Sequence, residues 1–232
     1  MIFGGSIAAV ALGTVAFVGG HFLLSHPLRA ALLRAVGQRG FPGIYSVAVA
    51  LGFTWMIYAH ATAPYVALWG DPIWARHVLL LIMVPAVLLV VAGNTTPART
   101  ALGLDRVSGA AQAGAGIHAI CRHPSLCGMA LWAMGHMIAN GDAATVILTG
   151  GILVLTIAGM RAIDARKLKD FGAEYQGFMA RTSLLPFLAL AQGRARFSWA
   201  ALGWWRVGLS AAVYAALLFG HQYFIGRSAL PL

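Results

Sequence analysis

The chain has 232 residues, of which 60% are hydrophobic and only 9% are charged. Charged residues make up about a quarter of a typical soluble domain, so this composition excludes a soluble globular protein and indicates an integral membrane protein. The formal net charge is +10, from 16 basic and 6 acidic residues. Basic residues that border apolar segments are typical of contact with anionic lipid. We therefore expect the lipid bilayer as a partner, and no nucleic acid.

Apolar segments that are long enough to cross a bilayer as helices follow one another along the chain. They predict an all-α fold, a polytopic membrane helical bundle of about six transmembrane helices. We expect a single integral-membrane domain over residues 1–232. The first segment lacks a basic start and a small-residue cleavage site, so it is interpreted as a retained helix. The segments cover approximately residues 3–24, 43–62, 74–93, 124–140, 143–163 and 202–224.

The basic residues are distributed unequally when the connections between these helices are assigned alternately to the two sides of the membrane. Only Arg76 and Arg227 fall on one side, and the other basic residues fall on the opposite side. Because basic loops stay in the cytoplasm, this pattern predicts that both termini lie outside and that the long basic connections are cytoplasmic.

Two connections carry a recognisable signal. "ANGD", from Ala139 to Asp142, is typical of a tight turn and predicts that the fourth and fifth helices form an antiparallel hairpin. The stretch from Asn94 to Arg122 is rich in Gly, Ala and Thr, and it either folds over a cofactor or forms a mobile loop.

An amphipathic cytoplasmic helix is predicted after the fifth transmembrane helix, because apolar residues recur there at spacings of three and four. It either continues that helix or bends onto the membrane surface. Gly172 weakens it by about 1 kcal/mol relative to Ala. The helix is expected to end between Thr182 and Pro186, because proline disfavours helical geometry in the preceding residue. Its apolar stripe consists of Leu168, Phe171, Tyr175 and Phe178.

The two cysteines, Cys121 and Cys127, fall near the cytoplasmic side. A structural disulfide is not expected in a reducing compartment. Two residues six positions apart would also point to different faces of a helix.

Histidine is abundant for a membrane chain, and ionisable residues at membrane depth are functional candidates. His21 and His123 fall at similar depth near the cytoplasmic ends of two helices, which is the geometry that bis-histidine haem ligation needs. His136 lies 13 residues after His123, roughly 20 Å along a helix, so these two cannot share a metal. Small residues near the pair leave space for a planar cofactor: Gly19, Gly20, Gly128 and Ala130. The outward histidines form a second group: His60, His77, His136 and His221.

Simpler interpretations of the same residues stay open. Small residues in membrane helices commonly serve close packing, and histidines at helix ends are commonly interfacial. Arg122 can extend to lipid headgroups, and Pro124 suits the first turn of a helix. Arg161, Asp164 and Arg166 either complete a polar cluster with Arg122, or Arg161 and Asp164 form an i, i+3 pair.

Several motifs follow one another in a fixed order along the chain. They are "GGHFLLSHP" (Gly19 to Pro27), "GQRGFPGIYS" (Gly37 to Ser46), "CRHPSLCGMALWAMGHMIANGD" (Cys121 to Asp142), and Asp164 followed by "FG" and "RTSLLPF" (Phe171 to Phe187). These motifs resemble the NnrU family of membrane proteins, and the resemblance extends through Phe187. The family's bacterial members are associated with denitrification, and it includes the plastid 15-cis-zeta-carotene isomerase.

The resemblance implies a haem b protein in which the redox state of the iron gates double-bond isomerisation. The implied iron ligands match His21 and His123 in this chain. The isomerase has a cysteine three residues before the second histidine, where this chain has Ile120, with Cys121 one place later. Whether Cys121 ligates iron is therefore left open.

A second resemblance is to isoprenylcysteine carboxyl methyltransferase and related membrane methyltransferases, in which a basic-histidine motif holds S-adenosylmethionine. This chain departs from that pattern at Asp164-Ala165-Arg166, where an acidic pair or Glu-Arg is usual, and at Leu126, where a tyrosine is usual. Haem is therefore the preferred cofactor.

The sequence thus predicts a haem b-binding, multi-pass protein of the bacterial inner membrane. Its function is either redox-gated cis/trans isomerisation of a lipophilic polyene or a haem-linked role in denitrification with a partner in nitrogen-oxide reduction. The alternatives are an S-adenosylmethionine-dependent methyltransferase and a non-enzymatic assembly or sensing factor for nitrogen-oxide reductases. Iron is assigned to His21 and His123, and the cofactor-binding residues are His21, Arg122, His123, Asp164 and Arg166.

Overall fold

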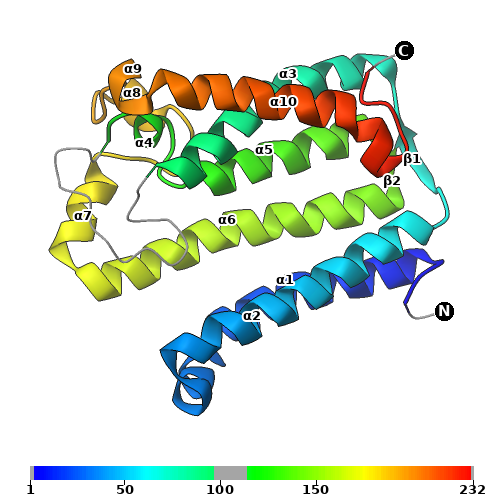
Figure 1. Cartoon of the computed structure of the whole chain (residues 1–232), viewed down its shortest axis with the longest axis horizontal. Coiled ribbons are helices and arrows are strands. Elements are labelled where there is room, and N and C mark those ends of the chain that lie inside the picture. The colour runs from blue at the N-terminus through cyan, green and yellow to red at the C-terminus, as the bar shows by residue number, and fades with distance from the viewer. Residues whose placement is uncertain (1–2, 97–113, 231–232) are drawn as a thin grey trace. The chain divides into compact units, whose positions relative to one another are not determined.

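The structure is a computed structural model that describes residues 3–96 and 114–230. It confirms the all-α fold (Figure 1). The long helices are α1 (Ile7–Ser25), α2 (Arg29–Thr62), α3 (Ile73–Thr95), α5 (Pro124–Ala139), α6 (Ala143–Phe171) and α10 (Trp204–Ile225). The short elements are α4 (Ile117–Ile120), α7 (Ala173–Ala180), α8 (Leu188–Ala191), α9 (Trp199–Leu202) and the strands β1 (Ala67–Gly70) and β2 (Gly141–Asp142).

The predicted membrane segments coincide with the long helices. Within the described residues, five of these helices are long and apolar enough to cross a membrane: α1, α2, α3, α6 and α10. The remaining long helix, α5, has 16 residues, fewer than the roughly 20 that a bilayer needs. It was the shortest of the predicted segments. The chain is therefore a polytopic membrane protein. The shortest predicted segment is confirmed as helical, but at 16 residues it is shorter than a bilayer needs.

The second helix begins much earlier than expected. The apolar pattern predicted a start near residue 43, whereas α2 begins at Arg29. Gly37 interrupts it with a φ of 70°, a left-handed conformation that glycine adopts without strain. A connection that was expected between the first two membrane helices is thus largely helical, with a break at Gly37.

The chain forms two compact units, and the boundaries in sequence fall directly before α3, inside α5 and inside α6. Unit 1 comprises Met1–Pro72 and His136–Leu155, and unit 2 comprises Ile73–Gly135 and Thr156–Leu232. The expectation of one integral-membrane domain stays a prediction. The loop residues 97–113 lie outside the described residues, so neither interpretation of that stretch is tested.

In unit 1, α1 and α2 pack side by side (Figure 1). A Cβ atom on Gly13 would lie 3.0 Å from the Met56 backbone, and one on Gly52 would lie 3.1 Å from the Phe17 backbone. These glycines therefore permit the close helix contact that is common in membranes. The two connections that were expected on the outer side also meet here, because β1 pairs antiparallel with β2 at the predicted turn.

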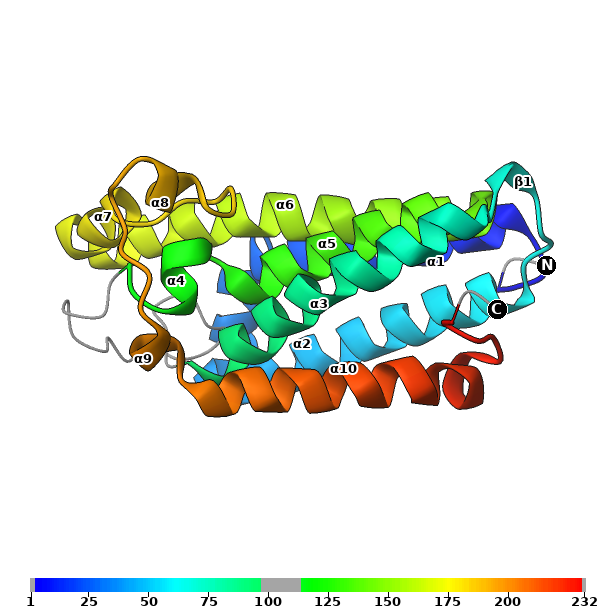
Figure 2. The same cartoon turned by 90° about the horizontal axis from the view of Figure 1, so that it is seen from above.

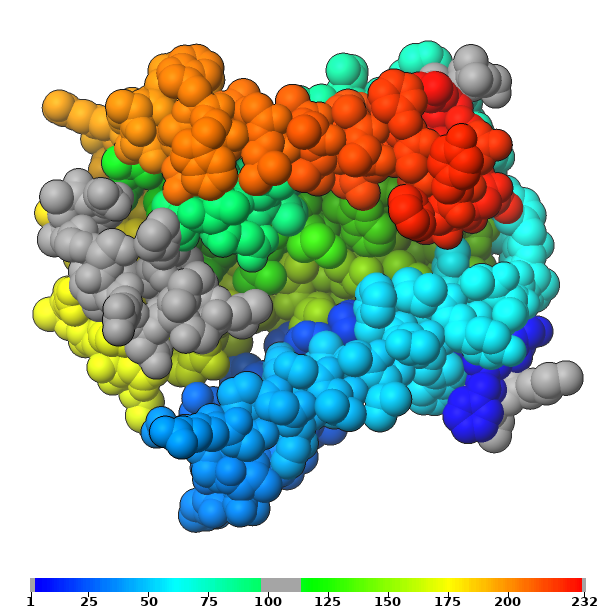
Figure 3. Space-filling view, viewed as in Figure 1, coloured from blue at the N-terminus to red at the C-terminus, as the bar shows by residue number. Residues whose placement is uncertain are grey.

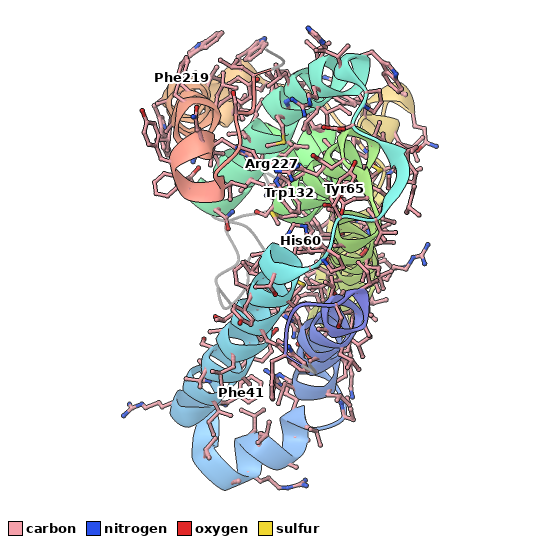
Figure 4. All side chains as sticks on the ribbon, turned by 90° about the vertical axis from the view of Figure 1, so that its right-hand side faces the viewer. Phe41, His60, Tyr65, Trp132, Phe219 and Arg227 are labelled. Atoms are coloured by element: carbon pink, nitrogen blue, oxygen red, sulfur yellow. A yellow bond between two sulfur atoms is a disulfide. The ribbon has the colours of Figure 1, made fainter. Side chains whose placement is uncertain are left out.

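In unit 2, α10 packs against α3 (Figure 2). The Tyr214 hydroxyl on α10 donates to the Leu80 carbonyl at 3.1 Å. Many of the exposed side chains of α10 are large and apolar. Figure 3 shows this helix as a continuous row of orange to red atoms. Phe219 in this row is 67% exposed (Figure 4). Exposed apolar surface on a membrane helix is the expected contact surface for lipid.

Candidate functional site

Four polar side chains meet inside unit 2. Three of them, Arg122, His123 and Asp164, were predicted as site residues, and the fourth is Tyr175. Arg122 and His123 lie between α4 and α5, Asp164 lies on α6, and Tyr175 lies on α7. The sequence folds this way because Gly172, with a φ of 53°, ends α6 and turns the chain into α7. All four side chains are buried. We call this group the Asp164 cluster.

The Asp164 carboxylate is the centre of the cluster. Its Oδ1 atom accepts a hydrogen bond from the Tyr175 hydroxyl at 2.6 Å and lies 2.8 Å from His123 Nε2. Its Oδ2 atom accepts from Nη1 of Arg122 in a buried ion pair. Both carboxylate oxygens are therefore used, which satisfies the rule that a buried charge is stable only when it is paired and hydrogen-bonded.

The Arg122 side chain is held on every side by protein acceptors. Nε donates to the Thr182 hydroxyl at 2.9 Å, and Nη2 donates to the carbonyls of Met179 at 3.1 Å and Thr182 at 3.3 Å. Its backbone N–H donates to the Ser183 carbonyl at 2.7 Å. Arg122 thus ties the start of α5 to the end of α7, and its assignment to cofactor binding stays a prediction.

The carboxylate also decides which nitrogen of His123 carries a proton. A carboxylate paired with a guanidinium is ionised and can only accept hydrogen bonds. His123 Nε2 must therefore donate to Asp164, in either charge state of the ring. His123 is buried, and its ring makes no other hydrogen bond within the described residues. Nδ1 is the nitrogen left for a ligand.

Tyr175 was not recognised as a site residue in the sequence. It was placed in the apolar stripe after the fifth helix, and the structure buries Tyr175 and Phe178 as that stripe predicts, whereas Leu168 is 41% exposed. Burial raises the pKa of the Tyr175 hydroxyl, so the phenol stays protonated and donates. The signal that was missed is a polar atom on the buried face of an amphipathic helix.

Two arginines near Asp164 on α6, Arg161 and Arg166, take no part in the hydrogen bonds described for the cluster. Arg161 is exposed, and the Asp164 oxygens pair with Arg122, His123 and Tyr175 instead. The i, i+3 pair is therefore not formed. Arg166 is half-buried, and none of the hydrogen bonds of the cluster described here involves it. Its assignment to cofactor binding stays a prediction.

His21, the other predicted iron ligand, lies on α1 in unit 1. Its Nδ1 atom donates to the Phe17 carbonyl at 3.1 Å, and its ring is half-buried against the rings of Phe17 and Tyr45. A Cβ atom on Gly19 or Gly20 would meet nothing within 4 Å. Space is thus available beside His21, and its pairing with His123 stays a prediction.

The small residues after His123 have a different role. A Cβ atom on Gly128 would lie 2.5 Å from the Ala86 carbonyl oxygen, and one on Gly93 would lie 2.4 Å from the Ser125 hydroxyl. Gly128 therefore lets α3 and α5 approach each other closely. The space that was expected there for a cofactor is filled by α3.

His118 falls within the stretch from Asn94 to Arg122, for which the sequence predicted no regular structure. It lies on α4, is 5% exposed, and packs edge-on against Phe178 with 5.7 Å between ring centroids. Neither ring nitrogen has a hydrogen-bond partner within the described residues. Burial lowers the pKa of His118 to about 4, so the imidazole is neutral at physiological pH.

The outward histidines are divided between the two units. His60 and His136 belong to unit 1, and His77 and His221 belong to unit 2. His60 lies near the end of α2 (Figure 4). Its Nε2 atom hydrogen-bonds the Thr145 hydroxyl at 3.1 Å. His77 donates to the Ile73 carbonyl at 2.9 Å and His221 to the Arg227 carbonyl at 2.7 Å. Among residues 3–96 and 114–230, no group of three or more His, Cys, Asp or Glu side chains is suited to a metal ion.

The expectation that the two cysteines stay apart is wrong. Cys121 and Cys127 form a disulfide. The argument from helix faces fails because Cys121 is extended and precedes α5, so only Cys127 is helical. In this oxidised state the Cys121 sulfur is not available as an iron ligand.

Comparison with known proteins identifies relatives of the chain. Residues 9–229 match the family model described as NnrU protein. Over 79 residues the chain is 32% identical to the 15-cis-zeta-carotene isomerase of Zea mays and 30% identical to that of Arabidopsis thaliana, both described as chloroplastic. Each match covers 34% of this chain and 22% of the relative, so the chain spans about a fifth of the length of these relatives. No solved structure matches.

Proposed function

This chain belongs to the NnrU family, and from that premise we propose that it is a membrane cis/trans isomerase of a lipophilic polyene with haem b as its cofactor. The reaction class is supported by the similarity to two 15-cis-zeta-carotene isomerases. A lipophilic substrate suits a chain whose described part consists largely of apolar helices, because such a substrate reaches the protein from the bilayer.

One structural observation carries the cofactor part of the proposal. At both His21 and His123, one ring nitrogen is held by a protein oxygen, and the other makes no hydrogen bond within the described residues. Histidines that bind metals are usually oriented in this way, because the bond at one nitrogen fixes the lone pair at the other. His21 would bind iron through Nε2, and His123 would bind it through Nδ1. His60, His77 and His221 also have one nitrogen held, by a hydroxyl or a carbonyl oxygen, whereas His123 is held by a buried carboxylate.

In the proposed isomerisation, the Asp164 cluster positions His123 and transfers no proton. Rotation about a double bond moves no atom between molecules, so the reaction needs no general acid or base. Haem, when bound, supplies a redox-active iron that can change the bond order of a conjugated chain. The protein's own task is to hold the ligand nitrogen in place and to exclude water. Asp164, Arg122 and Tyr175 do this for His123 through buried hydrogen bonds.

The cofactor is tested by visible spectra of the full chain, purified in detergent after expression with ample haem supply. We expect a haem b spectrum that changes on reduction, and its loss in His21→Ala and in His123→Ala. His77→Ala is the matched control, because His77 is exposed and is also held by a backbone carbonyl. Wild-type protein without haem would contradict the proposal, and binding of S-adenosylmethionine instead would favour a methyltransferase.

The reaction is tested by adding reductant and a cis-carotenoid to the haem-loaded protein and measuring the isomer ratio by chromatography. We expect conversion to the trans isomer. Haem binding without conversion, together with lost maturation of nitrogen-oxide reductases in a deletion strain, would favour the non-enzymatic assembly or sensing factor and a role in denitrification.

A further inference from the structure

A segment of unit 2 exposes large apolar side chains where the chain leads into its last membrane-spanning helix. It extends from Leu185 to Trp205, and it contains α8, α9 and the first residues of α10. We call it the 185–205 segment. Exposed apolar patches mark contact surfaces for a membrane or for another protein. The exposed apolar residues of the segment are Leu185, Phe187, Leu188, Trp199, Trp204 and Trp205.

The 185–205 segment lies at one surface of the membrane. Arg206, in the first turn of α10, donates to the Thr95 hydroxyl at 3.1 Å and to the Thr95 carbonyl at 3.0 Å, and Thr95 ends α3. Because α3 and α10 are both long enough to cross a bilayer, the level at which these two ends meet is a bilayer surface. In both views α8 and α9 lie at the same end of unit 2 as the start of α10 (Figure 1, Figure 2). The segment is therefore at the level of the lipid headgroups.

Aromatic side chains form a compact group at this level. Trp199 and Trp204 stack with 4.9 Å between ring centroids and 2° between ring planes, and Phe197 packs edge-on against Trp199 at 4.9 Å. Trp204 is 66% exposed. Tryptophan is enriched where one end of its ring system meets hydrocarbon and the other meets water. This group is therefore suited to the boundary between headgroups and acyl chains.

Phe187 is exposed at the cost of an unfavourable backbone. Its φ is 66°, and within the described residues it is the one residue other than glycine with a positive φ. A bulky residue rarely adopts this conformation. The loop is held by two backbone hydrogen bonds of Phe187, in which its N–H donates to the Ile120 carbonyl at 2.8 Å and its carbonyl accepts from Ala191 at 2.9 Å. Glycine would suit this backbone better, so the advantage of phenylalanine lies in its exposed ring.

The charge of this region is of one sign. Residues 175–232 contain no aspartate or glutamate. Arg194 and Arg196 are exposed, and they lie between the apolar loop and the tryptophans in sequence. The guanidinium of Arg194 donates to neutral acceptors, the Gln192 side chain at 2.8 Å and the Ala180 carbonyl at 2.7 Å, which leave its charge uncompensated. The surface thus combines positive charge with exposed aromatic rings.

We propose that the 185–205 segment is a binding surface for an anionic phospholipid. The lipid phosphate contacts Arg194 and Arg196, and the upper acyl chains contact Phe187 and the stacked tryptophans. Arginine suits this role because its planar guanidinium matches a phosphate group. An acidic protein would match the charge but would bring no hydrocarbon to the exposed rings, so the surface favours a lipid. This inference does not depend on the proposed isomerase or on haem.

The test counts the lipids that stay bound to the full chain. The protein is purified in a non-ionic detergent and titrated with phosphatidylglycerol or with phosphatidylcholine of the same acyl chains, and bound lipid is measured by native mass spectrometry. We expect phosphatidylglycerol to bind at least about fivefold more tightly, the effect of a single arginine near anionic lipid. Equal binding of the two lipids would overturn the proposal and would leave the arginines for an acidic protein partner.

One variant tests the charged part of the surface. Arg196→Gln should weaken the binding of phosphatidylglycerol by about fivefold and leave that of phosphatidylcholine unchanged. Arg227→Gln is the matched control, because Arg227 is also exposed but follows the other end of α10. Equal affinity for phosphatidylglycerol in Arg196→Gln and Arg227→Gln would show that the anionic lipid binds elsewhere.

A second variant tests the apolar part. Asparagine adopts a positive φ more readily than phenylalanine, so Phe187→Asn should not lower the thermal stability in detergent, yet it should weaken the binding of both lipids. Phe224→Asn is the control, because Phe224 is 87% exposed near the other end of α10. Unchanged lipid binding in Phe187→Asn, or an equal loss in Phe224→Asn, would remove Phe187 from the surface and contradict the proposal.

Discussion

Helix α6 has a buried aspartate at each end, and the two carboxylates are used in different ways. Asp142, directly before the helix, accepts a hydrogen bond from the Thr145 backbone N–H at 3.1 Å, three residues away. Asp164, near the other end, accepts from Arg122, His123 and Tyr175, which are 11 to 42 residues away in sequence. The first is a local helix cap, and the second joins three segments of unit 2.

This difference shows which of the two carboxylates other polar side chains can replace and which they cannot. A cap oxygen satisfies one backbone N–H at the start of a helix, and any short polar side chain can replace it. A carboxylate that neutralises a buried guanidinium and orients a histidine has no equivalent substitute. We therefore expect Asp164 to contribute both to the stability of unit 2 and to the geometry of His123, whereas the Asp142 carboxylate acts at the start of α6.

The largest effect is expected from Asp164→Ala. The change leaves the Arg122 guanidinium buried without its counter-charge, and breaking a buried pair in this way costs about 3–5 kcal/mol. The free energy of unfolding in detergent, measured by denaturant titration, checks this value. A decrease in the free energy of unfolding below about 1 kcal/mol is typical of an exposed ion pair. Such a result would show that Asp164 contributes no more to stability than the helix cap at Asp142.

The second prediction concerns the pH dependence of the stability of unit 2, in which His118 is buried. Burial lowers the pKa of His118 from 6.5 to about 4, so between these values the unfolded chain binds more protons than the folded one. The stability due to the neutral ring is fully present above pH 6.5 and is lost as the pH falls through 4, by about 3 kcal/mol in total. His118→Leu should lack this loss, and unfolding measured from pH 7 to pH 4 compares the two proteins. An identical pH dependence in both would contradict the burial of a neutral imidazole.

Tyr175→Phe removes a single hydrogen bond of the Asp164 cluster, the one from the Tyr175 hydroxyl to Asp164. The ring packing is conserved and one hydrogen bond to a charged acceptor is removed, which costs about 1.5–3 kcal/mol. The same denaturant titration measures the loss. Phe178→Leu is a control for packing in α7 that removes no hydrogen bond. A Tyr175→Phe protein as stable as the wild type would show that the hydroxyl does not support Asp164.

The smallest effects are expected at Asp142. Asp142→Ala removes the cap and should cost about 1 kcal/mol, whereas Asp142→Asn keeps a capping oxygen and should change stability by a few tenths of a kcal/mol at most. Thermal unfolding of the two variants side by side resolves this difference. A loss in Asp142→Asn as large as that in Asp164→Ala would mean that the two ends of α6 are alike.

Much of the fold follows from apolar segment length, which is why the six long helices fall where the sequence predicted them. The part of α2 before residue 43 was missed because its arginines and glycines resemble a loop, although helical geometry continues on both sides of Gly37. Membership in the Asp164 cluster was only partly predictable. Arg122, His123 and Asp164 were identified, but the partner of Asp164 stayed open between Arg122 and Arg161, because side-chain pairing depends on tertiary contacts that spacing does not encode.

Residues outside regular helices were the least predictable. Cys121 pairs with Cys127 because an extended residue before a helix can approach the helix's own first turns, a contact that helix periodicity does not describe. Tyr175 and His118 were not predicted as buried polar groups, because Tyr175 was assigned to an apolar stripe and His118 falls in a stretch interpreted as a loop. Their burial depends on tertiary contacts.

The central claim, that the Asp164 cluster serves a haem-dependent isomerase, is tested most directly by a matched pair of variants. Wild type, Asp164→Asn and Asp142→Asn are loaded with haem, reduced, and given a cis-carotenoid in proteoliposomes, and the isomer ratio is followed over time. We expect conversion by the wild type and by Asp142→Asn, and little or none by Asp164→Asn. Conversion by Asp164→Asn at the wild-type rate, or no conversion by the haem-loaded wild type, would contradict it.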